Sequence, residues 1–372
     1  MTHRKLLTHY SLGGLALPNR IVMAPMTRCR ATNDDLAPTA MHAQYYAQRA
    51  SAGLIVSEGT PVSPQARGYA YTPGLYSAAQ VSGWQGVTDA VHCAGGRIFA
   101  QLWHCGRIGH RSLRADRSPP VGPGTLALAA KVMAFDDDGK PAAVPCDAPR
   151  ALETAEVKAI VADFAEAARN AAAAGFDGVE IHGANGYLLD QFRCSVINTR
   201  NDEYGGSLHN RCRLLLETVA AVSAAIGHAR VGVRISPLGT AHDMPPDPEP
   251  ALTYGHIACE LDRIGIAYLH VYDQSASWIR DPADALLQHL RASFSGALIL
   301  CGGFDRDRAE AVLQSDSADL VAFGKPFISN PDLVARLRLG SDLAPWDTKT
   351  FYKGDAHGYI DYPTLDTLAL RH

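Results

Sequence analysis

The sequence predicts one (β/α)8 barrel, the TIM-barrel fold, and three observations support this prediction. Eight short and nearly all-apolar runs recur along the 372 residues. Runs of this kind are typical of strands that are buried on both faces of a parallel sheet. Longer amphipathic stretches separate them, which is the strand–helix alternation of an α/β fold. No G-x-G-x-x-G opens a first strand–helix unit, so the competing doubly wound sheet is disfavoured.

Each predicted strand is an apolar run that ends near a glycine, a proline or a polar residue. Eight runs fit this description: Ile21–Pro25, Leu54–Gly59, Arg97–His104, Gly178–Gly183, Val231–Pro237, Tyr268–Asp273, Ala297–Gly303 and Leu320–Pro326. The predicted helices alternate with the strands, and Thr154 and Glu156 mark the start of one of them. These helices are Thr39–Ser51, Ala78–Ala94, Glu153–Ala174, Asn210–Ile226, Glu249–Ile264, Pro282–Ala292 and Arg306–Gln314.

Two further segments do not belong to the strand–helix repeat. Leu6–Leu17 is predicted to form a short hairpin before the first strand. Cys105–Arg150 follows the third strand and is rich in Pro and Gly. Because it is too long for a plain loop, we expect residues 105–150 to fold over one end of the barrel. No stretch has the character of a linker, so residues 1–372 are expected to form a single domain.

Composition excludes several classes of protein. The formal net charge is −4, which argues against nucleic acid or an anionic membrane as the main partner. No apolar run approaches the roughly 20 residues of a membrane span, and the first residues lack the apolar stretch of a signal peptide. The eight cysteines form no C-x2-C pair, so no metal site is expected. We therefore expect a cytoplasmic protein with reduced thiols.

Functional groups of such barrels lie at the carboxyl ends of the strands, and several informative polar residues stand there. Thr27 follows the first strand, where its hydroxyl either bonds a ligand or caps a turn. Gln101 and Trp103 share one face of the third strand. Gln101 suits the edge of a pyrimidine-like ring, although a satisfied core amide is an equal alternative. Arg234, inside the apolar fifth strand, needs either an anionic ligand or a distant acidic residue as its partner.

The fourth strand carries the strongest signal, because three polar residues follow it within a few positions. His182 and Asn185 are three residues apart, so both point the same way if the turn between them is helical. Two neutral donors that converge on one oxygen would activate a carbonyl group. Tyr187 is a weak acid that could deliver one proton. A lone histidine here is more often structural, but the cluster beside glycines favours a functional site.

Glycines also end the seventh and eighth strands, at Gly303 and Gly324. Paired glycine turns at these two strands commonly bind phosphate in barrels. Lys325 would supply the positive charge.

Taken together, these strings resemble the Old Yellow Enzyme family, especially its branch of N-ethylmaleimide and pentaerythritol tetranitrate reductases. The resemblance runs from end to end of the chain. It rests on Leu17–Ile21, Ala24–Arg28, Tyr45–Gly53, Gln101–Arg107, His182–Phe192, Tyr204–Ser207, Arg234–Pro237, Asn330–Leu333, Thr350–Tyr352 and Gly358–Pro363.

The resemblance implies non-covalent FMN at the carboxyl end of the barrel. Thr27 would bond the flavin C4 oxygen, Gln101 the pyrimidine edge, and Arg234 would lie near N1 and the C2 oxygen. Gly59 would let the ring lie close to the backbone. The complete implied cofactor site is Pro25, Met26, Thr27, Gly59, Gln101, Arg234, Gly303, Gly324 and Lys325, the last three for the phosphate.

The implied reaction is the NAD(P)H-dependent reduction of the activated C=C bond of α,β-unsaturated carbonyl compounds. Hydride would pass from FMN N5 to the β-carbon, and Tyr187 would protonate the α-carbon. NADPH is the expected reductant, with NADH possible, and nitro compounds or nitrate esters are further candidate substrates. The implied catalytic set is His182, Asn185, Tyr187 and Thr27, and the implied substrate pocket is Tyr69, Trp103, His182, Asn185, Tyr187, Ala241 and Tyr352.

The alternatives are a flavin-dependent isomerase on the same scaffold and a flavin redox sensor without turnover. The partner is expected to be a small molecule, and the protein a monomer or a homo-oligomer. Two residues depart from the family pattern. Lys325 stands where relatives commonly have Arg, which removes the bidentate fork, and Ala241 stands where they often have an aromatic residue. Tyr272–Asp281, which contains Trp278, is expected to form a loop on the substrate side.

Overall fold

The computed structural model describes residues 4–273 and 285–369. Eight parallel strands form a closed barrel, in which each strand is hydrogen-bonded to its neighbours in chain order and the last closes on the first. The predicted (β/α)8 barrel is therefore confirmed. The strands are β3 (Ile21–Met23), β4 (Leu54–Pro61), β5 (Ile98–Trp103), β10 (Gly178–His182), β11 (Val231–Ile235), β12 (Tyr268–Tyr272), β13 (Ala297–Cys301) and β14 (Leu320–Phe323).

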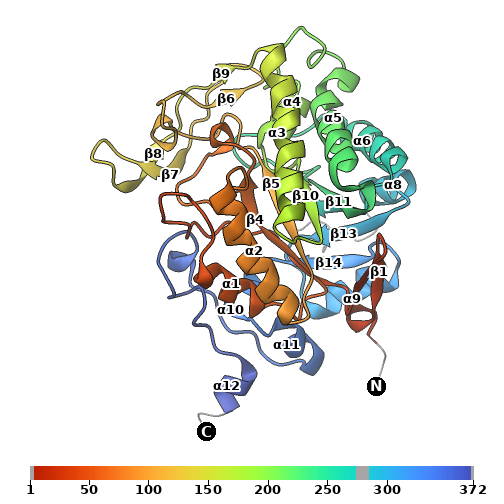
Figure 1. The fold of residues 1–372 in the computed structure, drawn as a ribbon. Helices are drawn as coiled ribbons and strands as arrows, with labels where there is room; N and C mark the ends of the chain where they lie inside the picture. The colour runs from red at the N-terminus through yellow and green to blue at the C-terminus, as the bar shows by residue number, and fades with distance from the viewer. Residues whose placement is uncertain (1–3, 274–284, 370–372) are drawn as a thin grey trace.

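Helices surround the barrel on its outer side (Figure 1). All seven predicted helices are present, and the one predicted to begin at Pro282 is described from Ala285 onward. They are α1 (Ala40–Ala47), α2 (Ala78–Cys93), α3 (Thr154–Ala173), α5 (Leu208–Ile226), α6 (Pro250–Ile264), α8 (Ala285–Ser293) and α9 (Arg306–Gln314). Short additional helices are α4 (Leu188–Arg193), α10 (Lys325–Ser329), α11 (Leu333–Leu339) and α12 (Leu365–Ala369).

Local chemistry explains where the long helices begin. The Ser77 hydroxyl accepts a hydrogen bond from the Gln80 N–H, and Ser207 does the same for Asn210. Each such cap satisfies one of the free N–H groups in the first turn. Further along α3, one face buries Val157, Ile160 and Phe164 against the barrel.

The N-terminal hairpin is confirmed within the predicted segment. It pairs β1 (Tyr10–Leu12) with β2 (Leu15–Leu17). Leu12 and Leu17 belong to the same buried cluster as Val22, Leu54 and Leu320 of the barrel strands. The hairpin therefore packs at the amino-terminal end of the strands, and the opposite, carboxyl end is left for a binding site.

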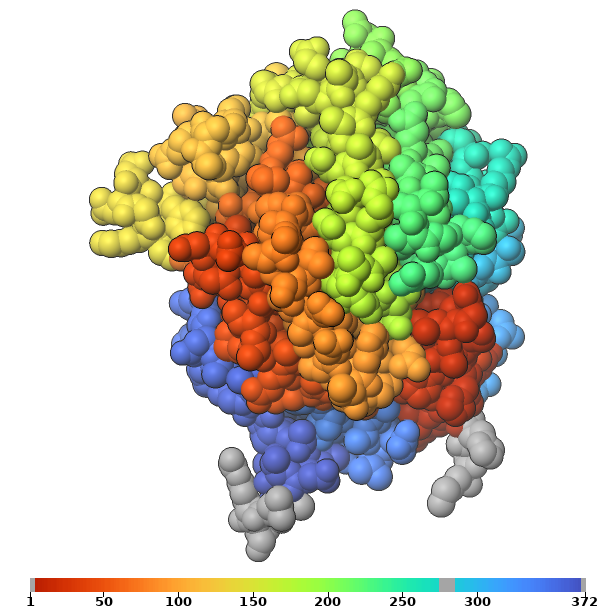
Figure 2. All heavy atoms as spheres, viewed as in Figure 1, coloured from red at the N-terminus to blue at the C-terminus, as the bar shows by residue number. Residues whose placement is uncertain are grey.

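The long insertion after the third barrel strand contains four short strands. The strands β7 (Lys131–Phe135) and β8 (Pro141–Pro145) form an antiparallel hairpin. The strands β6 (Val121–Gly122) and β9 (Arg150–Ala151) pair in parallel. In the space-filling view, the β7–β8 hairpin projects from the body as a yellow lobe (Figure 2). Its inner residues pack on Trp103 and Cys105, so the predicted insertion is confirmed and lies beside the barrel's carboxyl end.

Within the described residues, no helix has the length and apolar character needed to cross a membrane. The eight cysteines are all free thiols. No group of three or more His, Cys, Asp or Glu side chains in the described part of the chain is arranged to hold a metal ion.

Candidate active site

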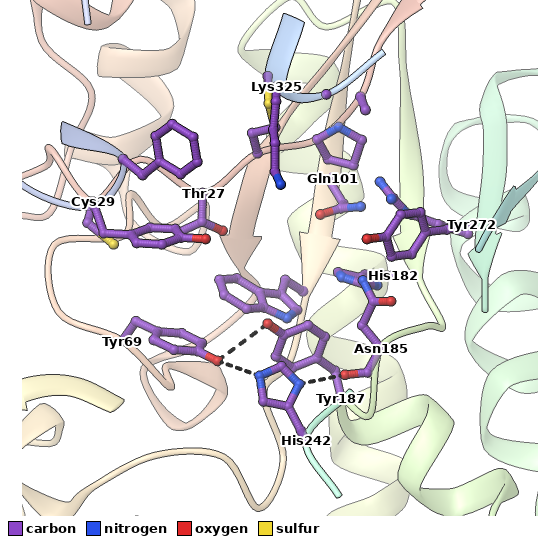
Figure 3. A pocket seen from close by; sticks show the side chains of 18 of the residues that line it. Thr27, Cys29, Tyr69, Gln101, His182, Asn185, Tyr187, His242, Tyr272 and Lys325 are labelled. Atoms are coloured by element: carbon purple, nitrogen blue, oxygen red, sulfur yellow. Dashed lines mark hydrogen bonds between the residues drawn. The ribbon is translucent and has the colours of Figure 1, made fainter. Parts of the chain in front are cut away.

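A cavity of about 640 Å³ opens at the carboxyl ends of the barrel strands. Side chains from β5, β10, β11 and the segment after β3 converge on it (Figure 3). Most of the predicted site residues line this one cavity. They are Pro25, Met26, Thr27, Tyr69, Gln101, Trp103, His182, Asn185, Tyr187, Arg234, Gly324, Lys325 and Tyr352.

Three predicted residues are not among those that line the cavity, namely Gly59, Gly303 and Ala241. Gly59 lies against an aromatic ring, because a Cβ there would lie 2.5 Å from a carbon of Trp103. Its missing side chain makes room for that indole. Ala241 is replaced in the cavity wall by the next residue, His242. Gly303 has φ +69°, a conformation that favours glycine.

Below the cavity, a buried carboxylate orients Gln101. The Gln101 amide nitrogen donates to Glu180 at 2.7 Å, and Tyr268 and His270 donate to the same carboxylate at 3.1 and 2.7 Å. Burial acts to raise the pKa of Glu180, but His270, Arg234 and Gln101 together hold it below its ordinary value. A carboxylate only accepts hydrogen bonds. The amide nitrogen of Gln101 must therefore face Glu180, which leaves its amide oxygen as an acceptor.

Arg234 is buried without an acidic partner among the described residues. Its Nε atom has no hydrogen-bond partner, and its guanidinium lies 4.6 Å from the centre of the Tyr272 ring. Arg234 is near enough to Glu180 to lower the pKa of that carboxyl, but the Glu180 carboxylate is already bonded to other donors. A buried cation with an orphaned donor is costly unless a ligand pairs with it. Of the two explanations open from the sequence, the geometry favours an electron-rich ligand.

His182 is a neutral hydrogen-bond donor. Burial, with Arg234 nearby, lowers its pKa to about 3. The Ala184 N–H donates to its Nδ1 at 3.4 Å, so Nδ1 carries the lone pair. The proton of the neutral ring is therefore on Nε2. An imidazole in this state can polarise a carbonyl group without giving up a proton.

Asn185 and Tyr187 lie beside His182, and the turn from His182 to Asn185 does not have the helical conformation that the sequence left open. Asn185 has φ 57°, in the left-handed region, and its N–H donates to the Ser236 hydroxyl at 2.8 Å. Gly186 follows with φ 76°. This tight turn still places both residues on the cavity. Burial raises the pKa of Tyr187 well above its ordinary value, so its hydroxyl keeps its proton at neutral pH.

Aromatic rings form one wall of the cavity. The ring of Tyr69 stacks on Trp103 with centres 5.5 Å apart, and Tyr187 meets the same indole edge-on at 4.9 Å. On another side, Lys325 is exposed, and its ammonium group lies 5.9 Å from the Trp346 ring centre. Of the loop predicted on the substrate side, Tyr272 lines the cavity, whereas Trp278 lies outside the described residues.

Several residues that line the cavity were not predicted from the sequence. His242 lines the cavity and directly follows Ala241, which was predicted to lie there. The signal for His242 was therefore its place in the chain beside a predicted pocket residue. Cys29 follows two residues after Thr27 and was hidden because it is not at the strand end itself. Lys131, Val132 and Met133 come from the β7–β8 hairpin, and no local pattern in the sequence places them at the barrel.

Comparisons with known proteins agree on one family. The model of the NADH:flavin oxidoreductase / NADH oxidase family matches residues 5–343. A curated relative, 12-oxophytodienoate reductase 1 of Oryza sativa subsp. japonica, is 42% identical over 369 residues, which cover 98% of this chain and 94% of the relative. The structure of morphinone reductase in complex with tetrahydroNAD has a TM-score of 0.92 and 47% identity, covering 97% of this chain and 98% of that one. The old yellow enzyme homologue from Zymomonas mobilis has a TM-score of 0.90 and 40% identity, covering 97% and 100%.

Proposed function

Because the chain belongs to the Old Yellow Enzyme family of NADH:flavin oxidoreductases, we propose a role for each cavity residue in the reaction of that family. The protein is an FMN-dependent ene reductase, which uses a nicotinamide reductant to reduce activated C=C bonds. The isomerase and sensor alternatives are disfavoured, because the relatives are reductases. When bound, FMN would supply the hydride chemistry, that is, transfer of hydride from the nicotinamide to the β-carbon of the substrate.

The cavity residues fit a flavin. Arg234 has a buried donor without a partner, and the pyrimidine edge with its N1 and C2 oxygen is an electron-rich partner for it. Gln101 presents its amide oxygen, an acceptor for the flavin N3–H. Thr27 would bond the C4 oxygen beside Pro25 and Met26. The phosphate would be held by Gly303, Gly324 and Lys325.

The substrate carbonyl would be held by two neutral donors. His182 offers Nε2–H and Asn185 its side-chain amide, both on the cavity surface. As charge develops on the carbonyl oxygen, each donor would lower the barrier by about 2–4 kcal/mol, judging from other oxyanion sites. The Tyr187 hydroxyl, still protonated at neutral pH, would give its proton to the α-carbon. Tyr69, Trp103 and Tyr352 would shape the pocket around the ring of an enone.

We further propose NADPH as the preferred reductant, with NADH as the alternative. The substrates would be small enones, with nitro compounds or nitrate esters as side substrates of the same flavin. The chain would act as one domain, as a monomer or a homo-oligomer, in the cytoplasm.

The observation that carries this proposal is the neutral His182 beside Asn185 and Tyr187 in a cavity with an unpaired buried Arg234. The test is an anaerobic visible spectrum of the purified protein, followed by NADPH and then 2-cyclohexenone. We expect a flavin band that bleaches with NADPH and returns with the enone. A band that bleaches but does not return would contradict the proposal that enones are substrates. A protein that stays colourless after incubation with FMN would overturn the whole assignment.

A further inference from the structure

A chain of hydrogen bonds leads away from the proposed acid. The Tyr187 hydroxyl lies 3.4 Å from the Tyr69 hydroxyl, and Tyr69 lies 3.2 Å from Nε2 of His242. On its other side, His242 Nδ1 lies 2.8 Å from the backbone carbonyl oxygen of Asn185. Figure 3 shows these three contacts as dashed lines, two of which meet at the Tyr69 hydroxyl while the third leaves the other side of the His242 ring. The chain thus joins three segments that are far apart in the sequence.

The carbonyl at its far end fixes the direction of this chain. A carbonyl oxygen only accepts, so Nδ1 of His242 carries a hydrogen. In the neutral ring, Nε2 is then a lone pair, and it must accept from the Tyr69 hydroxyl. The Tyr69 hydroxyl has a single hydrogen, and it donates that hydrogen to Nε2 of His242. Tyr187 must therefore donate to Tyr69, which directs the Tyr187 proton away from the substrate.

Protonation of His242 reverses the direction of the hydrogen bonds in this chain. With a hydrogen on Nε2, the imidazolium donates to Tyr69, and Tyr69 donates to Tyr187. The Tyr187 hydrogen is then released from the chain and can point at the substrate. One proton on His242 thus decides whether Tyr187 can act as an acid.

The surroundings of His242 allow this change of charge. The ring is only partly buried, and its exposed neighbour Asp243 follows directly. Arg107 holds the loop by donating to the His242 carbonyl oxygen at 2.9 Å and to that of Asp243 at 3.4 Å. The groups that face the ring are the Tyr69 and Tyr187 hydroxyls, neutral His182, the Arg107 guanidinium and the Asp243 carboxylate.

We propose that His242 supplies the proton that Tyr187 delivers, by way of Tyr69. This inference rests on the proposed function. After hydride has reached the β-carbon, the electron pair left at the α-carbon forms a C–H bond with the Tyr187 proton. The Tyr187 oxygen takes the Tyr69 proton, and Tyr69 takes the proton from Nε2. His242, now neutral, takes its next proton from water, so one solvent proton is used in each turnover.

Proton delivery should therefore weaken as pH rises. Burial lowers the pKa of His242 below the ordinary 6.5, although the Asn185 carbonyl raises it and Arg107 lowers it further. The charged form is present below that pKa and is lost as pH rises through it. Reoxidation of the bound flavin by an enone should slow over the same range. Reduction by NADPH needs no proton from Tyr187 and should not follow this profile.

The kinetic test compares both half-reactions of the holoenzyme between about pH 5 and pH 8, a range that spans histidine titration. His242→Gln can accept from Tyr69 but cannot carry a positive charge. We expect reoxidation by 2-cyclohexenone to be about tenfold slower at the acidic end and to lose its pH dependence, within the range of general acid effects. Tyr69→Phe interrupts the chain between His242 and Tyr187, so reoxidation of this variant and of the double variant should also lose its pH dependence. His209→Gln, on the exposed face of α5, is the matched control.

Several results would overturn the relay. One is a wild-type pH profile in His242→Gln, and another is a wild-type pH profile in Tyr69→Phe. If NADPH reduces the wild-type flavin but no enone reoxidises it at any pH, the proposed function itself fails, and the relay with it. Flavin absorbance retained after dialysis in both variants separates these cases, because it shows that the flavin site is intact.

A second measurement needs no turnover. In holoenzyme labelled with 15N-histidine, the imidazole resonances that vanish in His242→Gln belong to His242. At about pH 8, where the ring is neutral, we expect Nδ1 to be protonated and Nε2 to be bare. A ring with its proton on Nε2 would contradict the direction of the chain and overturn the proposal, whatever the rates.

Discussion

Glu180 and Gln101 are direct partners in the register of strands β10 and β5, and the Gln101 amide nitrogen lies 2.7 Å from the Glu180 carboxylate. Both side chains are buried below the cavity. The carboxylate is tolerated there because Tyr268 and His270 also donate to it. The negative charge of Glu180 decides which end of the Gln101 amide faces the cavity. An acidic residue that does not line the cavity therefore sets the polarity of one that does.

This relationship predicts a loss of flavin affinity in Glu180→Gln. A glutamine there can donate as well as accept, so it no longer forces the Gln101 amide oxygen toward the cavity. We expect the dissociation constant of FMN to rise by about tenfold to hundredfold, or roughly 1–3 kcal/mol, the scale of one misoriented buried hydrogen bond. Fluorescence titration of the apoprotein with FMN measures it. The exposed Glu166→Gln on α3 is the control. An unchanged dissociation constant would show that Glu180 does not determine the orientation of the Gln101 amide.

Replacing both His182 and Asn185 with Ala should cripple enone binding and turnover while FMN stays bound. The two donors are proposed to act on the substrate oxygen and not on the flavin. Removing both should reduce kcat/KM by about a thousandfold or more, since each donor contributes about 2–4 kcal/mol. Steady-state kinetics with 2-cyclohexenone test the activity, and the flavin absorbance of the dialysed variant tests the cofactor. Unchanged kinetics would refute the proposal that His182 and Asn185 bind the substrate carbonyl oxygen.

Tyr187→Phe should slow one half-reaction selectively. The variant keeps the ring that packs on Trp103 but loses the hydroxyl that holds the proton. Loss of a positioned acid costs on the order of 10²-fold or more. Stopped-flow measurements should show slow reoxidation by an enone and normal reduction by NADPH. If neither half-reaction changes, another group or water supplies the proton.

Lys325→Ala should weaken the retention of FMN. The exposed Lys325 ammonium group stands at the start of α10, directly after Gly324, and both residues line the cavity where the phosphate is proposed to bind. Lys325→Arg should retain FMN at least as well as the wild type, because a guanidinium can bind phosphate with two parallel hydrogen bonds. Flavin content after extended dialysis compares the three proteins. Full occupancy of the alanine variant would rule out a phosphate contact at this position.

Acid should destabilise the fold because three histidines are buried in the neutral state. Burial lowers the pKa of His42 to about 4 and of His104 and His182 to about 3. Below pH 6.5 the unfolded chain binds a proton at each site that the folded chain does not, so stability is present above 6.5 and lost as pH falls. Each site then costs about 2 kcal/mol by pH 5.

Glu58 opposes this trend, because burial raises its pKa to about 7 and the folded state then binds the extra proton. The unfolding free energy should still fall between pH 7 and 5, because the three histidines together outweigh Glu58, and urea unfolding measures this loss. In His104→Asn the side-chain oxygen can still accept the Gly106 N–H bond that Nδ1 accepts now. This variant should lose about 2 kcal/mol of the pH dependence. Equal stability at both pH values would contradict the buried neutral histidines.

The fold could be predicted almost completely from the sequence. All eight strands lie within the predicted runs or extend them by a few residues, as at β4, which continues to Pro61. The reason is that strands covered on both faces must be apolar throughout, which leaves an unmistakable pattern. Several strands end earlier in the chain than predicted. β3 ends at Met23 and not at Pro25, because the apolar residues continue beyond the last residue of the strand.

The site could be predicted where a residue stands at the end of a strand. Gln101, His182 and Arg234 were placed correctly on the cavity by that rule alone. Gly59 and Ala241 were named from the family resemblance, and neither lines the cavity. Gly59 lies against Trp103 and His242 lines the cavity beside Ala241, because the resemblance does not tell which side of the backbone a neighbour occupies.

By itself, the sequence determined the barrel, its open carboxyl end and the residue types that reach it, since these follow from periodicity and chain order. Only the tertiary structure decided how those residues act on one another. The proton position on His182, the orientation of Gln101 and the chain from Tyr187 to His242 depend on single hydrogen bonds between distant segments. Hydrogen bonds act over about 3 Å, and no periodic pattern in a sequence encodes contacts of such short range.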